Sequence, residues 1–184
     1  QINPKVLFIT GEYFYNGKQI NILDRLGEIT KNIPSIKYVV IANYPGRKKI
    51  KKKLKLKINI IYWSELLRIR SSYITFQKFD FDHSISILYS SGTTGKPKCI
   101  CHRSGGVLLQ HLKEHQLHNE IKQNDNVFYF TTCGWMMWNW LVTVLSSKAS
   151  IVLFEGFPMY KRDDLLIKLA DEEKITLFGV SAKY

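Results

Sequence analysis

The sequence predicts an α/β fold with a largely parallel sheet and helices on its faces. Short apolar runs rich in Val, Ile, Phe and Tyr alternate along the chain with stretches of helical periodicity, and this alternation is typical of parallel strands joined by crossover helices. The 184 residues, 45% hydrophobic and 13% aromatic, have the composition of a packed globular protein. No apolar run approaches the roughly 18 residues that cross a bilayer.

The first part of the chain is predicted to hold strands, a hairpin turn and two helices. Asn16-Gly17 stands between aromatic residues and predicts the turn, and Ser64 is the predicted cap of the second helix. Strands are expected at residues 5–10, 38–42 and 58–62, and helices at residues 20–31 and 64–70.

From residue 85 onward the alternation is more regular. A helix introduced by a Ser-Gly-Gly turn is expected at 107–118, and further helices at 135–145 and 163–173. The expected strands are residues 85–89, 98–102, 127–131, 149–154 and 176–180.

The net charge of +12 raises the question of a nucleic-acid partner. Residues 47–57 hold eight of the 27 basic residues and no acid, so removing them leaves 12 − 8 = +4. Lys and Leu alternate over 53–57, which predicts an edge strand with one solvated side. The block lacks the interleaved aromatic residues of a single-strand binder. We therefore favour a solvated loop and edge strand, and we expect neither a nucleic-acid nor a membrane partner.

The three cysteines predict neither a disulfide framework nor a zinc site. Cys99, Cys101 and Cys133 are odd in number and lack paired spacing. We expect Cys99 and Cys101, on one strand, to point to opposite faces. The interpretation is of reduced thiols in a cytoplasmic protein.

Histidines cluster on the predicted helix 107–118. His111, His115 and His118 share one helix face, but no acid or cysteine completes a metal site. We expect a polar helix face and no metal. His102, at the end of the preceding strand, is either a packed residue or a residue near a nucleotide, and the sequence does not decide between these.

The stretch "SSGTTGKPK", residues 90–98, has the composition of a phosphate-binding loop. Glycines let successive backbone N–H groups converge on an anion, and the hydroxyl and lysine side chains add donors and positive charge. The loop is not a Walker A motif, because Ser90 and Pro97 stand where that motif needs Gly and Ser or Thr. Because of Pro97, the segment is expected to continue into a strand.

These residues resemble the phosphate-binding signature of the adenylate-forming (AMP-dependent) synthetase and ligase superfamily. The stretches "ILYSSGTTGKPKCICHRSGGVLLQHLKEHQLH" and "FYFTTCGWMMWNWLVTVLSSKASIVLFEG" resemble its acetyl- and acetoacetyl-CoA synthetase branch, and "TTCGWMMWNW" is most similar to the acetoacetate-activating members. The stretches "PKVLFITGEYFYNGK" and "FGVSAKY" extend the resemblance over nearly the whole chain. It is weakest through residues 47–57.

The resemblance implies an acid–thiol ligase. A carboxylate attacks the α-phosphate of ATP, which is bound with Mg²⁺, to give an acyl-adenylate and pyrophosphate; the thiol of coenzyme A then displaces AMP. The resemblance implies that the loop binds the ATP phosphates. The residues at the matching positions, which would have this role, are Ser90, Ser91, Gly92, Thr93, Thr94, Gly95, Lys96 and Lys98.

Trp135 is the candidate substrate-binding residue. The helix that begins near it is apolar nearly all round, which predicts burial in the core for most of its residues. The resemblance implies that aromatic residues here close the acyl pocket around a short chain, and a large indole would exclude longer acids by volume.

We expect residues 1–184 to be part of the large N-terminal domain of such a synthetase, truncated at both ends and without the small C-terminal domain. No catalytic residue is assigned, and the adenine, ribose and magnesium contacts are expected outside this chain, which should be inactive in isolation. The alternatives are an acetyl- or propionyl-CoA synthetase fragment and, from other classes, a basic nucleic-acid-binding domain or a non-catalytic interaction module.

Overall fold

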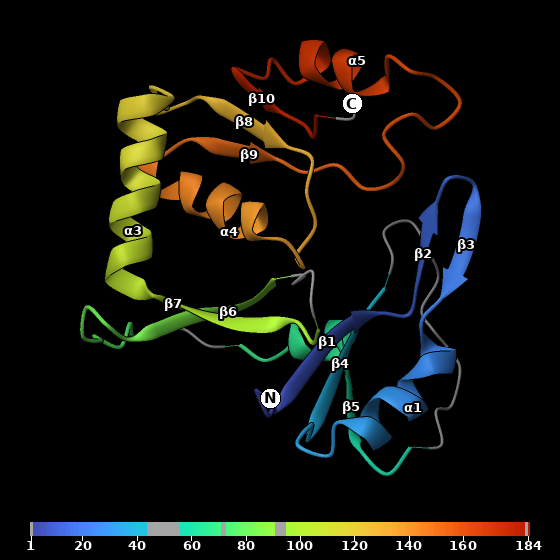
Figure 1. The fold of residues 1–184 in the computed structure, drawn as a ribbon. Helices are drawn as coiled ribbons and strands as arrows, with labels where there is room; N and C mark the ends of the chain where they lie inside the picture. Colours follow the sequence, from blue (N-terminus) through green and yellow to red (C-terminus); the bar gives the residue numbers. More distant parts are fainter. Residues whose placement is uncertain (1, 44–55, 71–72, 91–94, 183) are drawn as a thin grey trace. The chain divides into compact units, whose positions relative to one another are not determined.

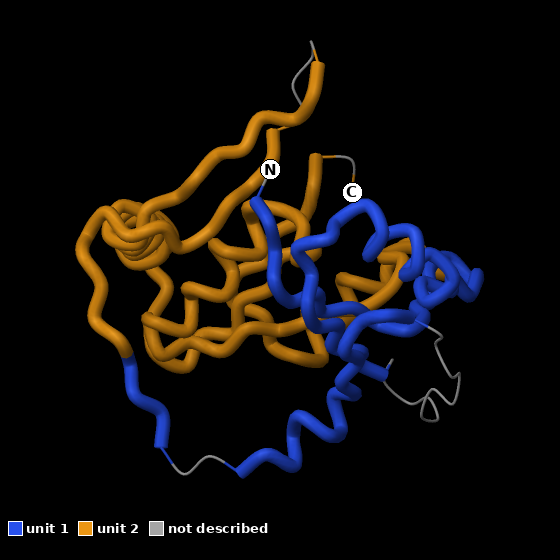
Figure 2. The backbone as a smooth tube through the Cα atoms, turned by 90° about the horizontal axis from the view of Figure 1, so that it is seen from below, with its two compact units in different colours: residues 1–76 blue, residues 77–184 orange. Residues whose placement is uncertain are grey.

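The computed structural model describes residues 2–43, 56–70, 73–90, 95–182 and 184. The chain divides into two compact units, residues 1–76 and 77–184, which Figure 2 shows in two colours. Each unit contains a three-stranded parallel sheet with helical connections. This arrangement confirms the predicted α/β class.

In the first unit the strand order of the parallel sheet is β1-β4-β5. A hairpin and a helix form the crossover from β1 to β4 (Figure 1). The elements are β1 (Val6–Thr10), β2 (Glu12–Tyr15), β3 (Lys18–Asn21), α1 (Leu23–Asn32), β4 (Tyr38–Ala42), β5 (Asn59–Tyr62) and α2 (Trp63–Leu66).

The predicted turn at Asn16-Gly17 is confirmed. It joins the antiparallel strands β2 and β3, and both residues have positive φ angles, +47° and +76°, as a type I′ turn requires. The predicted start of the first helix at residue 20 is wrong, because the hairpin ladder continues through Ile20, which pairs with Tyr13. The helix begins at Leu23.

Three further expectations for this unit need correction. Ser64 lies inside α2 and does not cap it; instead the carboxylate of Glu65 accepts the Tyr62 amide at 3.0 Å. The helix ends at Leu66, before the predicted residue 70. Of the basic block, residues 47–55 lie outside the described residues, while Leu56 packs on the core of the unit and is not in a strand.

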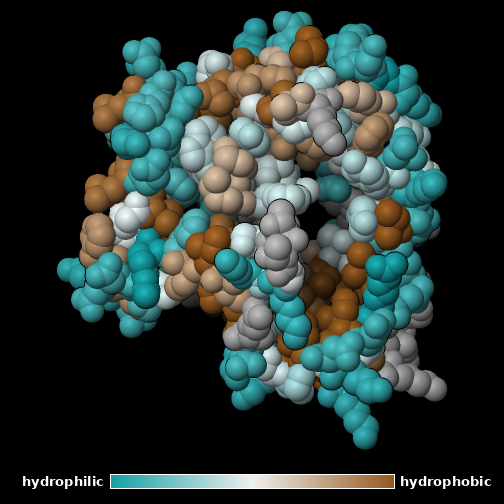
Figure 3. All heavy atoms as spheres, viewed as in Figure 1, coloured by the Kyte–Doolittle hydropathy of each residue, from teal (hydrophilic) through white to brown (hydrophobic). Residues whose placement is uncertain are grey.

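The core of the first unit lies between α1 and one face of the sheet. Strand residues alternate between faces, so that Leu7 and Ile9 meet the helix while Val6 and Phe8 face away. Phe8 is 62% exposed and contacts Trp63 edge-on at 6.5 Å between ring centroids. Figure 3 shows hydrophobic side chains gathered over this sheet. The buried core residues are Leu23, Leu26, Ile36, Val39 and Ile41.

The second unit begins with an antiparallel hairpin and continues into a parallel sheet of order β10-β8-β9. Its elements are β6 (Ser84–Ser90), β7 (Lys98–Arg103), α3 (Ser104–Leu112), the π-helical turn η1 (Lys113–His118), β8 (Asn126–Tyr129), α4 (Met136–Thr143), the 3₁₀ turn η2 (Val144–Ser147), β9 (Ser150–Val152), α5 (Leu165–Glu172) and β10 (Leu177–Gly179). The Ser-Gly-Gly segment expected before a helix is itself the first part of α3.

Helices cover both faces of the second sheet. Val127 and Tyr129 face the core cluster formed with Trp140 and Leu141 of α4. Phe128, between them, points to the other face and stacks on its strand neighbour Phe178 at 5.3 Å between centroids. Figure 1 shows α5 on that side of the sheet and α4 on the opposite side. Parallel sheets are typically enclosed in this way.

The expectation that Cys99 and Cys101 point to opposite faces is wrong. Both lie on β7, paired with Tyr89 and Ile87, and residues two apart in a strand share a face. All three cysteines are exposed, and none of them forms a disulfide. Among the described residues, no helix is long and apolar enough to span a membrane.

Candidate functional site

The β6–β7 hairpin holds the predicted phosphate loop. Ser90 and Lys98 are register partners, so residues 91–97 connect the ends of two paired strands. Gly95 has a φ of +139°, a conformation that side chains other than that of glycine rarely adopt. Lys96 and Lys98 are exposed. The expectation that the chain runs from Pro97 into a strand is confirmed.

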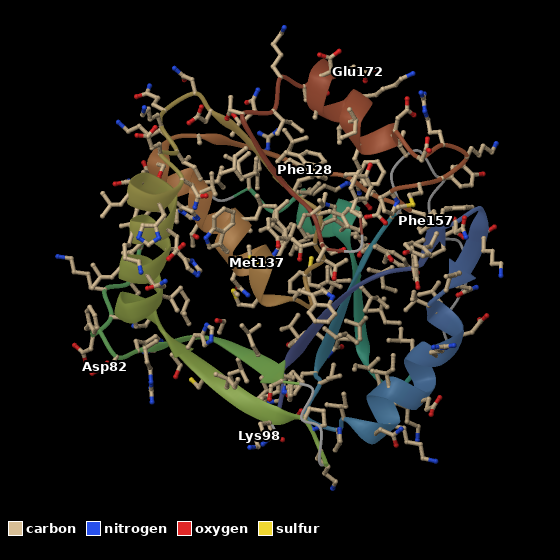
Figure 4. The ribbon with its side chains drawn as sticks, turned by 45° about the horizontal axis from the view of Figure 1, so that its top comes forward. Asp82, Lys98, Phe128, Met137, Phe157 and Glu172 are labelled. Atoms are coloured by element: carbon tan, nitrogen blue, oxygen red, sulfur yellow. The ribbon has the colours of Figure 1, made fainter. Side chains whose placement is uncertain are left out.

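Four of the eight predicted phosphate-binding residues, numbers 91–94, lie outside the described residues. The structure therefore brings Ser90, Gly95, Lys96 and Lys98 to one end of the hairpin. Figure 4 shows Lys98 at that end and Asp82 near the other.

Hydrogen bonds hold the opposite end of the hairpin against α3. The guanidinium of Arg103 donates to the Asp82 carbonyl at 2.9 Å and to the Ser84 hydroxyl at 3.3 Å. The Ser104 hydroxyl donates to the Phe81 carbonyl at 3.2 Å. Any side chain at Gly105 would overlap the Phe81 ring. The junction fixes the direction in which the hairpin leaves the helix.

The expected polar helix face is wrong for two of its three histidines. His111 is 6% exposed and His115 is fully buried. His118 is exposed and lies 3.3 Å from the Glu114 carboxylate. No group of three His, Cys, Asp or Glu residues within the described part of the chain is placed to hold a metal ion.

The two buried histidines contact α4. His111 Nδ1 lies 2.8 Å from the Thr143 hydroxyl. The His115 Nε2–H donates to the Trp140 carbonyl at 3.1 Å, and the two rings meet edge-on. Burial lowers the pKa of both histidines below the usual value, and each of them has a further histidine neighbour that lowers it more. Both imidazoles are therefore neutral at pH 7.

The end of α4 explains why side chains meet the Trp140 carbonyl. The helix tightens into the 3₁₀ turn η2, and the Val144 amide bonds to the Leu141 carbonyl. The Trp140 carbonyl accepts the His115 Nε2–H, and the Thr143 hydroxyl oxygen lies 2.8 Å from the same carbonyl oxygen. Side chains thus satisfy an acceptor that a continuing α-helix would pair with a backbone amide.

A cavity of about 500 Å³ opens between α3, α4 and β10. Its lining residues are Gln110, His111, Glu114, Asn119, Tyr129, Met136, Met137, Trp140, Leu177, Phe178 and Gly179. Figure 4 shows Met137 on α4 and Phe128 within the sheet region.

Trp135 is not among the residues that line this cavity. It precedes the first residue of α4, and its side chain is 68% exposed. The next two residues, Met136 and Met137, do line the cavity. Sequence reasoning assigned these methionines to the core, and it missed His111 as a cavity residue. The spacing of three residues between His111 and Glu114, which places both on one helix face, was the sequence signal that could have indicated it.

His102 is half-buried at the end of β7. Its charge contributes to lowering the pKa of His111, so the two rings are electrostatic neighbours. The alternatives for its role remain those stated from the sequence.

Comparison with known proteins identifies relatives over the whole chain. The model of the AMP-binding enzyme family matches residues 2–182. Acetoacetyl-CoA synthetase from Gallus gallus is 41% identical over 188 residues, and acetoacetyl-coenzyme A synthetase from Rhizobium meliloti is 38% identical over 184; each alignment covers all of this chain and 28% of the relative. Malonamoyl-CoA synthetase vrtB from Penicillium aethiopicum is 38% identical and 27% covered.

A solved structure gives the same result. The acetoacetyl-CoA synthetase from Streptomyces lividans superposes with a TM-score of 0.88 at 34% identity, over all of this chain and 27% of that one. The chain thus spans just over a quarter of the length of the relatives it matches. Since the family model extends over nearly every residue, the chain belongs to the AMP-binding enzyme family.

Proposed function

We propose that the protein containing this chain is an ATP-dependent acyl-CoA synthetase that activates acetoacetate. The observation that carries the proposal is the similarity of the whole chain to acetoacetyl-CoA synthetases from a vertebrate and a bacterium. Residues 1–184 would form part of its large N-terminal domain. The isolated chain would show no turnover, because the remaining parts of the site lie elsewhere in the protein.

The proposed reaction has two steps. A carboxylate oxygen of the acid attacks the α-phosphorus of ATP and pyrophosphate leaves. The sulfur of coenzyme A then attacks the acyl carbon, the thiol proton is released, and AMP departs. In the first step the protein must hold the acid in line and stabilise charge on the phosphates. ATP is proposed to arrive with Mg²⁺.

The loop at the tip of the β6–β7 hairpin is proposed to hold the ATP phosphates. The residues in this role are Ser90, Ser91, Gly92, Thr93, Thr94, Gly95, Lys96 and Lys98. Support comes from the hairpin, which presents Gly95 in a conformation suited to a turning backbone and leaves both lysine side chains exposed.

The cavity beside α4 is proposed to hold the acyl chain. Trp135 keeps its proposed role in closing that pocket, supported by its place immediately before two methionines that line the cavity. An acetyl- or propionyl-CoA synthetase is the alternative within this class. The acyl groups named for the relatives, acetoacetyl and malonamoyl, both carry a carbonyl on the third carbon, which favours a 3-oxo acid over acetate or propionate.

Acid-dependent exchange between ATP and pyrophosphate tests the function in the intact protein. Acetoacetate, acetate, propionate and butyrate are offered at equal concentration. We expect acetoacetate to support the fastest exchange. Exchange with acetate or propionate alone would keep the reaction and replace the substrate, while a folded protein that is silent with all four acids would refute the synthetase.

Lys96→Met tests the phosphate loop separately. Loss of one charge-assisted hydrogen bond, worth about 1.5–3 kcal/mol, is expected to raise the KM for ATP roughly 10- to 100-fold. Lys37→Met, at an exposed lysine of the first unit, is the matched control and should leave this KM unchanged. Equal effects from both substitutions would remove the assignment.

The remaining proposals concern partners and location. The partners are small molecules, namely the acid, ATP and coenzyme A, and the proposed compartment is the cytoplasm. Support comes from the family and from the three cysteines, none of which forms a disulfide. Quantitative binding to a polynucleotide that ATP does not displace would favour the nucleic-acid alternative instead.

A further inference from the structure

The cavity of the second unit has apolar walls and one group of polar residues along α3 and η1. Met136, Met137, Leu177 and Phe178 supply the apolar surface. The polar residues at the lining are Gln110, His111, Glu114, Asn119 and Tyr129. A ligand held there would be recognised by whichever of these groups retains a hydrogen-bonding atom for it.

Three of the five polar residues are already engaged with one another. The Gln110 amide donates to the Glu114 carboxylate at 3.0 Å, and this carboxylate also lies 3.4 Å from the Lys113 ammonium and 3.3 Å from His118. The Asn119 amide donates to the Glu114 carbonyl at 2.8 Å. These contacts are made within α3, η1 and the residue that follows them. The polar groups that remain to bind a ligand are His111 and the Tyr129 hydroxyl.

Resting on the proposed function, we propose that His111 is a specificity-determining residue that donates a hydrogen bond to the oxygen on the third carbon of a 3-oxo acid. The acyl chain would lie against the two methionines, and Nε2–H of His111 would meet the keto oxygen.

The hydrogen bonds around Trp140 allow the His111 tautomer that carries its proton on Nε2. The Trp140 carbonyl is an acceptor only, so His115 must donate from Nε2. The Thr143 hydroxyl oxygen lies 2.8 Å from this carbonyl and 2.8 Å from Nδ1 of His111. Because His115 already gives the carbonyl a donor, we assign the single hydroxyl hydrogen of Thr143 to Nδ1 of His111. His111 then carries its proton on Nε2, and this atom has no hydrogen-bond partner among the described residues.

Burial sets the chemistry of this donor. His111 is 6% exposed and its pKa is lowered, first by burial and then by His102. A neutral imidazole offers the keto oxygen one N–H donor. Because it carries no positive charge, it does not favour an acid with a second carboxylate at that position. An acid without the oxygen would offer this N–H no acceptor, and a site built to hydrogen-bond a group of the substrate rejects an analogue that lacks it.

The test compares acetoacetate with butyrate, which has the same chain length and no keto oxygen, in the full-length protein. His111→Leu is expected to reduce the ratio of kcat/KM for acetoacetate to that for butyrate by about 10- to 100-fold, as expected for loss of one buried hydrogen bond. The KM for ATP should stay constant. His111→Gln, whose amide offers an N–H, should recover part of the ratio.

Three further variants keep the proposal open to refutation. Thr143→Val removes the orienting hydroxyl at nearly constant volume and should lower the same ratio by less than His111→Leu. His118→Leu, at the exposed histidine of the same helix, should leave the ratio unchanged. If Tyr129→Phe abolishes the preference while His111→Leu keeps it, the assignment to His111 is wrong.

The outcomes separate this inference from the function on which it rests. A wild-type protein that prefers acetoacetate, with the preference retained in His111→Leu and Thr143→Val, refutes the role of His111 alone. A wild-type protein that activates none of the acids refutes both. If His111→Leu does not fold, the ratios measured for His111→Gln and Thr143→Val decide.

Discussion

The two parallel sheets each have three strands, but helices cover their faces differently. In the first unit α1 covers one face, and the other face carries Phe8, which is 62% exposed. In the second unit α4 and α5 cover opposite faces, and Phe128, at 1% exposed, is enclosed.

The candidate functional features lie in the unit whose sheet is covered on both faces. All five histidines, the hairpin with the candidate phosphate loop and the cavity lie within residues 77–184. The described part of the first unit offers a sheet, a hairpin and a packed helix. A site that must hold side chains in fixed positions needs support from several directions, and the doubly covered sheet provides it.

The largest expected effect comes from removing core volume in each unit. Leu26 and Leu141 are 0% and 1% exposed in separate core clusters. Leu26→Ala and Leu141→Ala should each cost about 2–5 kcal/mol. Native-state hydrogen exchange is expected to show lost protection in the mutated unit only. Equal losses in both units from either substitution would show that the two sheets form one cooperative structure.

Glycine-to-alanine substitutions should have opposite signs in the two units. Gly27 lies inside α1, where a Cβ would meet only a side-chain atom of Leu56 at 3.6 Å, so Gly27→Ala should stabilise by about 0.5–1 kcal/mol. At Gly179 a Cβ would overlap the ring of Tyr129, and Gly179→Ala should cost about 1–3 kcal/mol. Chemical denaturation measures both. A stabilising Gly179→Ala would show that the Tyr129 ring moves aside freely.

Acid is expected to weaken the second unit alone. The folded pKa values of His111 and His115 are lowered by burial, so below the unfolded value of about 6.5 the unfolded chain binds more protons. Stability is therefore complete above that pH and falls as the pH drops through it. Residues 1–76 contain no histidine.

Hydrogen exchange at pH 7 and pH 5.5, corrected for intrinsic exchange rates, measures this effect. His115→Leu should flatten the pH dependence in the second unit, whereas His118→Leu, at an exposed residue, should not. A loss of protection in the first unit over the same interval would contradict the assignment.

The sequence predicted the parts of the fold that depend on local patterns. The apolar runs that became β4, β8 and β10 were each located to within a few residues, because burial on both faces of a strand leaves a continuous apolar signal. The pattern did not show that β6 and β7 pair with each other as an antiparallel hairpin. Strand pairing depends on contacts between segments, and no local periodicity reports it.

The histidines illustrate the same limit at the candidate site. A spacing of three or four residues places side chains on one helix face but does not say whether that face meets solvent or another helix. His111 and His115 were expected at a polar surface, and the packing of α4 buried them. The loop at residues 90–98, in contrast, could be proposed from the sequence alone, because its residue types are those that bind phosphate; its role stays a prediction.

The smallest expected effect concerns the end of η2. Lys148 has a φ of +59° and donates its amide to the Leu145 carbonyl at 3.1 Å, so a residue with a Cβ occupies a position that favours glycine. Lys148→Gly should stabilise the second unit by about 0.5–1 kcal/mol, or roughly 2–8 °C in Tm. Asn16→Gly in the first unit should gain less, since Asn tolerates this conformation. Equal gains at both positions would mean that Lys148 bears no strain that Asn16 lacks, since a Cβ in this conformation would then cost the same for both residue types.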